Sequence, residues 1–99
     1  MDNDKEKLNQ ILNHLNSGAT ILDVRSKWEF MLGHIPGSVN IPLSKVKKIL
    51  PELGPSNKMI ITVCASGVRS ETAANLLKDA GCDAINGGSW ATIRGLMEF

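Results

Sequence analysis

The stretch MIITVCASGVRS, residues 59–70, decides the fold. Its first five residues are apolar or β-branched, which predicts a buried strand over 59–63. A helix is predicted over 71–80, where apolar residues recur at helical spacing: Ala73, Leu76, Leu77 and Ala80. Cys64 therefore lies where a strand ends and a short loop leads into a helix. In parallel α/β sheets, sites are built at this edge.

The loop after Cys64 has the composition of an anion-binding turn. Backbone N–H groups and the positive end of the helix would converge on the sulfur, lower the thiol pKa and supply the nucleophilic thiolate. Gly67 permits a tight turn with positive φ. Arg69 lies near a helix N-terminus, where a cation needs a bound anion, a carboxylate partner or solvent. We interpret this loop as catalytic; the alternative is a buried cysteine before an ordinary helix.

Residues 64–70, CASGVRS, resemble the active-site loop of the rhodanese (thiosulfate sulfurtransferase) family. The similarity continues, in the family's order and spacing, through 22–25 (LDVR), 29–30 (EF), 33–37 (GHIPG), 40–42 (NIP) and 87–88 (GG). It implies an α/β fold, rhodanese-like, with a mainly parallel central β-sheet flanked by helices on both faces. The alternation of helical and strand segments predicts the same architecture.

The resemblance also implies two-step sulfur transfer with Cys64 as the catalytic residue. Its thiolate would take sulfane sulfur from thiosulfate or a related donor and become a persulfide, which cyanide or a thiol would then discharge. The implied substrate-binding residues, whose N–H groups would stabilise anionic sulfur, are Ala65, Ser66, Gly67, Val68, Arg69 and Ser70. No cofactor is expected, and no metal site, because the cysteines and histidines lack ligand spacing.

Two other functions compete with this interpretation. Cysteine phosphatases and arsenate reductases resemble C-x-x-x-x-x-R, whereas four residues separate Cys64 from Arg69. The shorter loop makes a narrower cradle, better sized for one sulfur than for a tetrahedral oxyanion. The second alternative is a persulfide carrier or interaction module with little turnover of its own.

Length and charge set the general expectations. Ninety-nine residues fit a single domain over 1–99. A formal charge of +1 gives no reason to expect nucleic acid or a membrane surface as a partner. The expected partners are a small-molecule sulfur donor and acceptor, with a protein thiol as a further candidate acceptor, and we expect a monomer. A charged N-terminus without a signal-peptide core, and two cysteines too few for a disulfide framework, predict a cytoplasmic location.

The first half of the chain predicts a helix, a strand over 19–24 and a short helix. The opening helix has an apolar stripe of Leu8, Ile11, Leu12 and Leu15, which leaves His14 off the stripe and solvated. Ser26 and Glu29 have capping-box spacing for a helix whose aromatics, Trp28 and Phe30, are expected in the core.

Polar residues near these elements are interpreted as structural. Asp23 and Arg25 should share one face and form an ion pair that fastens the strand to the next helix, with Glu29 as a candidate link. His34 lies in residues 33–37, whose glycines and proline predict a turn. It is not needed as a general base for Cys64, because the loop itself ionises the thiol.

The following segments predict a brief strand over 39–41 and a helix capped by Ser44 and stopped by Pro51, before a loop over 51–57. Lys45, Lys47 and Lys48 form a solvated face, or else a docking patch for an acidic partner.

The last segments predict a strand at 84–85, a turn at 86–88 and a final helix capped by Ser89. Gly81 should end the helix before them. Cys82 is interpreted as packed and inert, with a resolving thiol for Cys64 as the alternative. The resemblance places the Gly87–Gly88 turn beside the loop, where missing side chains would leave access to the sulfur.

Overall fold

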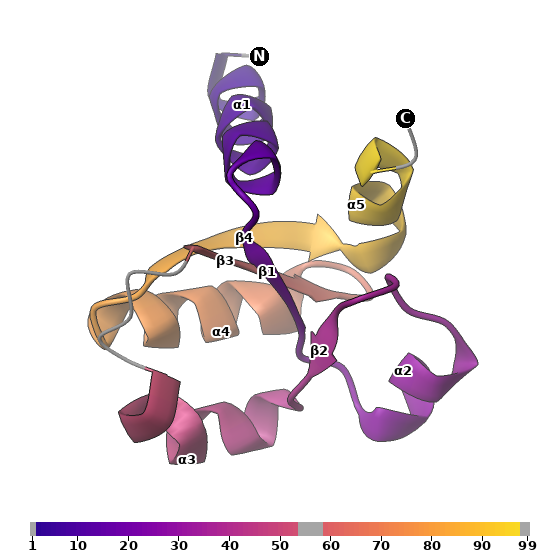
Figure 1. Cartoon of the computed structure of the whole chain (residues 1–99), viewed down its shortest axis with the longest axis vertical. Coiled ribbons are helices and arrows are strands. Elements are labelled where there is room, and N and C mark those ends of the chain that lie inside the picture. Colours follow the sequence, from indigo (N-terminus) through magenta and orange to yellow (C-terminus); the bar gives the residue numbers. More distant parts are fainter. Residues whose placement is uncertain (1, 54–58, 98–99) are drawn as a thin grey trace.

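Helices and strands alternate along the part of the chain that the computed structural model describes, residues 2–53 and 59–97 (Figure 1). None of the helices in these residues is long and apolar enough to cross a membrane. The elements are α1 (Asp2–Asn16), β1 (Thr20–Asp23), α2 (Lys27–Leu32), β2 (Val39–Asn40), α3 (Leu43–Leu53), β3 (Met59–Cys64), α4 (Val68–Asp79), β4 (Asp83–Ser89) and α5 (Trp90–Met97).

The four strands form one parallel sheet in the order β2-β1-β3-β4. The apolar strand predicted before Cys64 is β3, which pairs with β1 on one side and β4 on the other. Ile61 lies opposite Ile21 of β1 and Ile85 of β4. The predicted α/β architecture with a parallel central sheet is confirmed.

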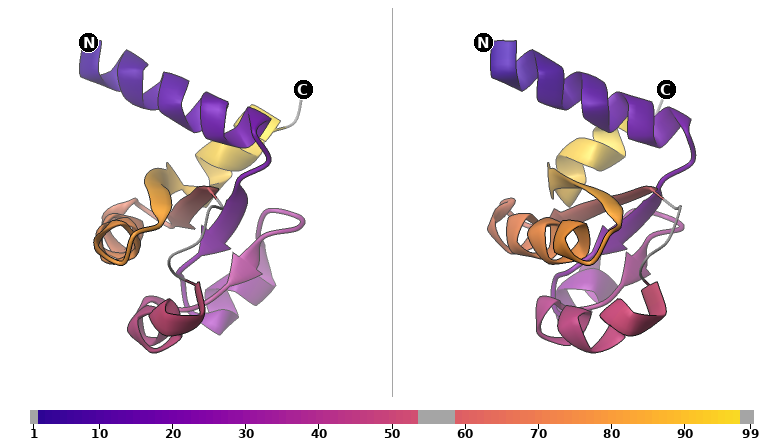
Figure 2. Two further views of the ribbon diagram at one scale, coloured as in Figure 1. Left: turned by 60° about the vertical axis from the view of Figure 1, so that its left-hand side comes forward. Right: turned by 90° about the vertical axis from the view of Figure 1, so that its left-hand side faces the viewer.

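Side chains of β3 alternate between two apolar clusters, one on each face of the sheet. Ile60 and Cys64 belong to the cluster that contains Leu77 of α4, and Val46 of α3 also packs there. Ile61 and Val63 belong to the other cluster, with residues from α1 and α5. Figure 2 shows α1 and α5 together on one side of the sheet, away from α3 and α4. Cys64 therefore faces α4.

β4 is longer than the sequence predicted, because residues 86–88 belong to the strand rather than to a turn. Thr62 pairs with Asn86 but Val63 pairs with Gly88, so Gly87 is the extra residue of a β-bulge. A Cβ on Gly87 would lie 2.6 Å from Ile61 Cγ2, and Gly88 has a φ of +80°. The two glycines permit a bulge as readily as a turn, which explains the wrong prediction.

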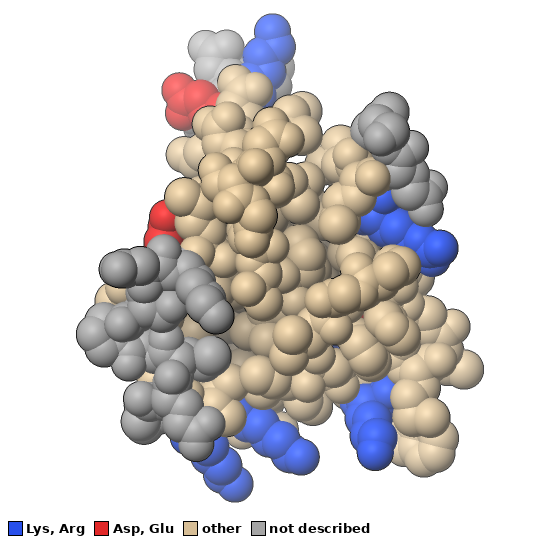
Figure 3. Space-filling view, in the orientation of Figure 1, with Lys and Arg blue, Asp and Glu red and all other residues tan. Residues whose placement is uncertain are grey.

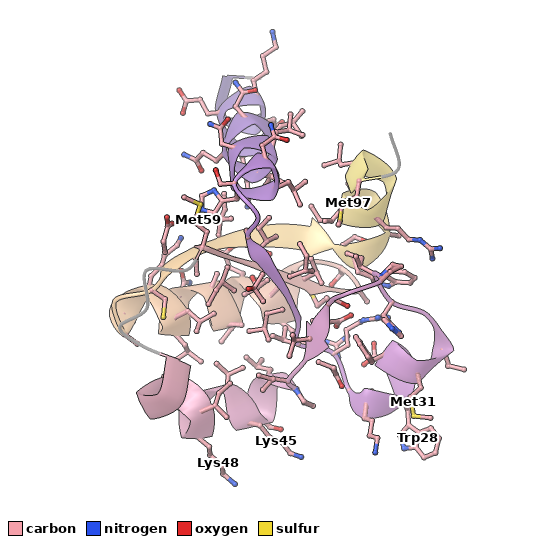
Figure 4. The ribbon with its side chains drawn as sticks, in the orientation of Figure 1. Trp28, Met31, Lys45, Lys48, Met59 and Met97 are labelled. Carbon is pink, nitrogen blue, oxygen red and sulfur yellow. The ribbon has the colours of Figure 1, made fainter. Side chains whose placement is uncertain are left out.

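Two predictions about burial in the first helices are wrong. His14 is not solvated: only 16% of its side chain is exposed, and Nε2 lies 3.1 Å from the Asp83 carboxylate. Trp28 is 75% exposed rather than in the core, and Figure 4 shows it pointing away from the protein beside Met31. Phe30 is partly buried and stacks on His34, 3.8 Å between ring centroids.

The predicted ends of α3 also need correction. The helix begins at Leu43, before Ser44, because the Leu43 N–H donates to the Val24 carbonyl and the Lys45 N–H donates to Pro42. It continues through Pro51 to Leu53, so Pro51 does not stop it. The rest of the predicted 51–57 loop lies outside the described residues.

The lysines of α3 fit both interpretations made from the sequence, a solvated face and a docking patch, because both require exposed side chains. Lys45, Lys47 and Lys48 are exposed. In Figure 4, Lys45 and Lys48 project from the lower edge, where Figure 3 shows basic side chains.

Two predicted helix ends are confirmed. α5 begins directly after Ser89, and Gly81 follows the C-cap residue of α4.

Candidate active site

The sulfur of Cys64 lies beneath the loop that joins β3 to α4. Backbone N–H groups point at it, among them Gly67 N at 2.9 Å and Ser70 N at 3.4 Å. The Ser70 hydroxyl lies 3.3 Å from the same sulfur. Cys64 itself is fully buried, so the expected open access beside the glycines is absent. A Cβ on Gly67 would lie 3.4 Å from the Gly88 Cα, so these two segments do lie side by side.

The N-terminus of α4 supplies these donors because no side chain caps it. Gly67 is the N-cap residue, with the positive φ of +101° that the sequence predicted. The first N–H groups of a helix have no partner within the helix. Ser70 is the third residue of α4, and its N–H bonds the sulfur instead of a cap. The predicted convergence of loop and helix donors on Cys64 is therefore present in the geometry.

Two opposing effects set the pKa of the Cys64 thiol. Burial acts to raise the pKa, because it removes the thiolate from water. Hydrogen bonds from the Ser70 hydroxyl, the Ser70 N–H, the Gly67 N–H and the Ser66 N–H together outweigh burial and lower the pKa below its ordinary value. The site therefore favours the nucleophilic form of sulfur.

Arg69 has the carboxylate partner that its position requires. Its Nη1 and Nη2 donate to the two Glu29 oxygens at 2.7 and 2.8 Å. Glu29 also accepts from the Ser26 N–H in the predicted capping box of α2. Glu29 therefore links α2 to the start of α4, rather than completing the Asp23–Arg25 pair as the sequence suggested.

Asp23 and Arg25 form the predicted ion pair at the end of β1. Arg25 Nη2 lies 2.7 Å from Asp23 Oδ2 and also 2.7 Å from the Gly33 carbonyl. The Arg25 guanidinium packs over Trp90, 4.7 Å from the ring centroid. The pair fastens β1 to the segment after α2 and to α5. His34 bonds the Phe30 carbonyl at 2.7 Å, which is consistent with a structural role.

The remaining predicted loop residues lie at the surface above the sulfur. Ala65 and Ser66 are exposed, and Val68 is 72% exposed. Gly67 and Arg69 are partly buried, whereas Ser70 is fully buried. The loop thus places its backbone and Ser70 against Cys64 and its other side chains outward.

Asn86 is a residue of this site that sequence reasoning missed. Its Oδ1 accepts from the Ser70 hydroxyl at 2.6 Å. Asparagine before two glycines was interpreted as turn chemistry; a polar residue directly after the apolar pair 84–85 was the available signal. The contact depends on the pairing of β4 with β3, which brings Asn86 beside Ser70 of α4.

The second cysteine belongs to the core. Cys82 is 6% exposed and packs in the same apolar cluster as Cys64. No disulfide is present between these two described residues. Within residues 2–53 and 59–97 there is also no group of three His, Cys, Asp or Glu side chains placed to hold a metal ion.

Comparisons with known proteins identify relatives of this chain. YrkF of Bacillus subtilis, whose name proposes a sulfur carrier role, is 48% identical over 61 residues, which cover 62% of this chain and 32% of YrkF. YqhL of the same organism is 42% identical over 67 residues, covering 68% of this chain and 52% of YqhL. The chain thus spans about half or less of these relatives.

Solved structures resemble almost the whole chain. The human single-domain sulfurtransferase TSTD1 is 27% identical with a TM-score of 0.70, covering 93% of this chain and 94% of that one. A rhodanese-related protein of Thermoplasma volcanium is 27% identical with a TM-score of 0.72, covering 89% and 87%. The family model described as the rhodanese-like domain matches residues 6–90. This chain belongs to the rhodanese-like domain family.

Proposed function

We propose that this protein is a sulfurtransferase that carries sulfane sulfur as a persulfide on Cys64, with thiosulfate or a related compound as donor. The observation that carries the proposal is the Cys64 sulfur, held at the end of β3 by N–H groups of Gly67 and Ser70. These donors favour a thiolate before attack and stabilise negative charge on sulfur when Cys64 is the leaving group.

The two proposed steps each conserve atoms and charge. The Cys64 thiolate attacks the outer sulfur of thiosulfate; the S–S bond of thiosulfate breaks, and its electron pair leaves with sulfite. Cys64 then bears a persulfide anion. Cyanide, or the thiolate of an acceptor, attacks the terminal sulfur, and the electron pair of the persulfide S–S bond returns to Cys64.

The Arg69–Glu29 pair supports sulfur transfer over phosphatase chemistry. Both Glu29 oxygens are bound by the two terminal nitrogens of Arg69. An arginine engaged in this way braces the loop against α2 and is a poor clamp for a free oxyanion. We expect negligible hydrolysis of aryl phosphates.

A persulfide carrier is the second candidate function. The similarity to YrkF, whose name proposes a sulfur carrier, favours it. In this case Cys64 would load from a donor and discharge to a protein thiol with little turnover on cyanide.

Intact-protein mass after thiosulfate treatment tests both candidates. The protein should gain the mass of one sulfur atom and lose it after cyanide. Cys64→Ser should gain none, whereas the matched control Cys82→Ala should behave as the wild type. Loading with steady thiocyanate production indicates an enzyme, and loading without turnover indicates a carrier. Failure to load from any sulfane-sulfur donor, with the fold intact, would refute both.

A further inference from the structure

The Ser70 hydroxyl has two neighbours but a single hydrogen to donate. Its oxygen lies 2.6 Å from Asn86 Oδ1 and 3.3 Å from Cys64 Sγ. Asn86 Oδ1 can only accept. The hydrogen of Ser70 therefore lies toward Asn86 when the sulfur is protonated, and the Cys64 thiol donates to Ser70 Oγ.

Asn86 is held firmly enough to determine where the hydroxyl hydrogen goes. Its Oδ1 also accepts from the Gly88 N–H at 2.9 Å. Its Nδ2 donates to the Gly67 carbonyl at 3.1 Å and to Glu71 Oε2 at 2.8 Å. The side-chain amide thus makes four hydrogen bonds, and the residue is 8% exposed. One side chain joins β4 to both the loop and the helix that surround the sulfur.

We infer that Asn86 is a positioning residue for sulfur transfer: it holds the Ser70 hydroxyl while the Cys64 sulfur is uncharged and releases it to the sulfur when charge develops there. The release leaves no buried acceptor without a partner, because Asn86 Oδ1 keeps its bond from Gly88. The inference rests on the proposed role of Cys64 as the reacting thiol.

The exchange follows the charge through the proposed reaction. In the thiolate, the Ser70 hydrogen turns to Sγ and adds a hydroxyl donor to the backbone N–H donors of the loop and of α4. In the persulfide, the charge moves to the terminal sulfur, and the hydrogen returns to Asn86. When the acceptor removes that sulfur, charge reappears on Sγ and the hydroxyl turns again. The donor is thus present when Cys64 attacks and when it leaves.

Several charged groups surround this network and would be common to every variant compared. Arg69 with Glu29 lies on the loop side, and Arg25 with Asp23 lies at the end of β1. Glu71 bonds Asn86 directly. A surface hollow beside Asn86 is lined further by Glu6, Lys7 and Lys78. Differences in thiol pKa between variants therefore report the altered hydrogen bonds and, where a substitution adds a carboxylate, the charge of that carboxylate.

The decisive experiment measures the thiol pKa of Cys64 from the ultraviolet absorption that a thiolate has and a thiol lacks. Cys82→Ala is the background, so that one cysteine titrates, and the readout needs neither a sulfur donor nor an open site. The variants are Asn86→Asp, Ser70→Ala and their combination. Asn40→Asp is the matched control, because Asn40 Nδ2 likewise donates two hydrogen bonds, in this case to the backbone carbonyls of Asp23 and Arg25.

Asn86→Asp should raise the pKa by about one unit, a tenfold loss of thiolate well below the pKa, because a carboxylate retains the Ser70 hydrogen. In the Ser70→Ala background the same substitution should shift the pKa by less than half as much. Asn40→Asp should leave it unchanged. An unshifted pKa in Asn86→Asp would overturn the inference. An equal shift with and without Ser70 would also overturn it, since the introduced carboxylate would then act by charge alone.

A spectroscopic measurement covers the case in which the Asn86 variant does not fold. At a pH below the thiol pKa, the S–H stretching band of Cys64 should lie at lower frequency in the Cys82→Ala protein than in the same protein with Ser70→Ala, because the thiol donates to Ser70. Identical frequencies would contradict the assigned hydrogen position. Neither readout depends on whether thiosulfate is the donor.

Discussion

Two arginine–carboxylate pairs lie near the Cys64 sulfur, and they differ in exposure. In the Asp23–Arg25 pair, the side chains are 0% and 5% exposed. In the Glu29–Arg69 pair, they are 37% and 38% exposed. Both pairs are close, with shortest N–O distances of 2.7 Å. Similar geometry therefore occurs in two very different dielectric surroundings.

The difference separates what each pair contributes. Removing one charge of the buried pair is costly, because the remaining charge then lies in the protein interior with neither a partner nor water to stabilise it. The exposed pair contributes little to stability, since solvent screens it. Its value is positional: it joins α2 to the first turn of α4, beside the donors to Cys64. Burial identifies the Asp23–Arg25 pair as part of the scaffold and the Glu29–Arg69 pair as a brace for the loop.

Removing one charge from the buried pair should have the largest effect. Asp23→Asn leaves the Arg25 guanidinium buried without a countercharge and should cost about 3–5 kcal/mol of unfolding free energy. Urea unfolding followed by circular dichroism measures the loss. A cost below about 1 kcal/mol would show that Arg25 reaches solvent, and the contrast between the pairs would fail.

The equivalent change in the exposed pair should cost much less. Glu29→Gln keeps the shape of the side chain and should reduce the free energy of unfolding by at most about 1 kcal/mol. The same urea experiment applies, with Asp23→Asn as the comparison. Equal costs for the two substitutions would mean that exposure does not distinguish the pairs.

Acid should remove the contribution of Glu29 gradually. Hydrogen bonds from Arg69, and then from the Ser26 N–H, lower the Glu29 pKa from 4.5 to about 2. Because the folded-state pKa lies below the unfolded one, the contribution is fully present above pH 4.5 and is lost as the pH falls toward 2. The stability difference between the wild type and Glu29→Gln should therefore shrink across this window. If the stability difference between the two proteins stayed constant over this pH range, ionisation of Glu29 would not be the source of its contribution.

The smallest effect is expected at Trp28, the neighbour of Glu29 on α2. Because its side chain is 75% exposed, Trp28→Ser should change the free energy of unfolding by no more than about 0.5 kcal/mol. Thermal unfolding of the two proteins gives the comparison. A loss of several kcal/mol would mean that α2 is anchored by its tryptophan rather than by Glu29.

Local patterns in the sequence predicted the centre of the fold and the site. An apolar run before Cys64 and helical spacing after it specify β3, the loop and α4, because strand and helix periodicity are properties of neighbouring residues. The Asp23–Arg25 pair and the Ser26–Glu29 capping box were predictable for the same reason. The donors from the loop N–H groups followed from the place of Cys64 before a helix.

The sequence did not predict contacts between segments that lie far apart in the chain. His14 bonds Asp83, and Asn86 bonds Ser70, so neither environment can be inferred from adjacent residues. The aromatic character of Trp28 favours burial but does not show which face of α2 meets the core. The bulge at Gly87 has the composition of a turn, and only the close approach of β3 distinguishes the two.

The position of β4 after the cysteine loop in the chain delays completion of the Asn86 hydrogen bonds during synthesis. Cys64 is made 22 residues before Asn86, which at ribosomal speed is roughly 1–4 s earlier. Until β4 pairs with β3, no asparagine bridges Ser70, Gly67 and Glu71. Until then, the Ser70 hydroxyl has no asparagine to hold its hydrogen, although the loop and the start of α4 already contain the backbone donors to Cys64. The hydrogen-bond network around Cys64 is therefore completed only when β4 has paired with β3.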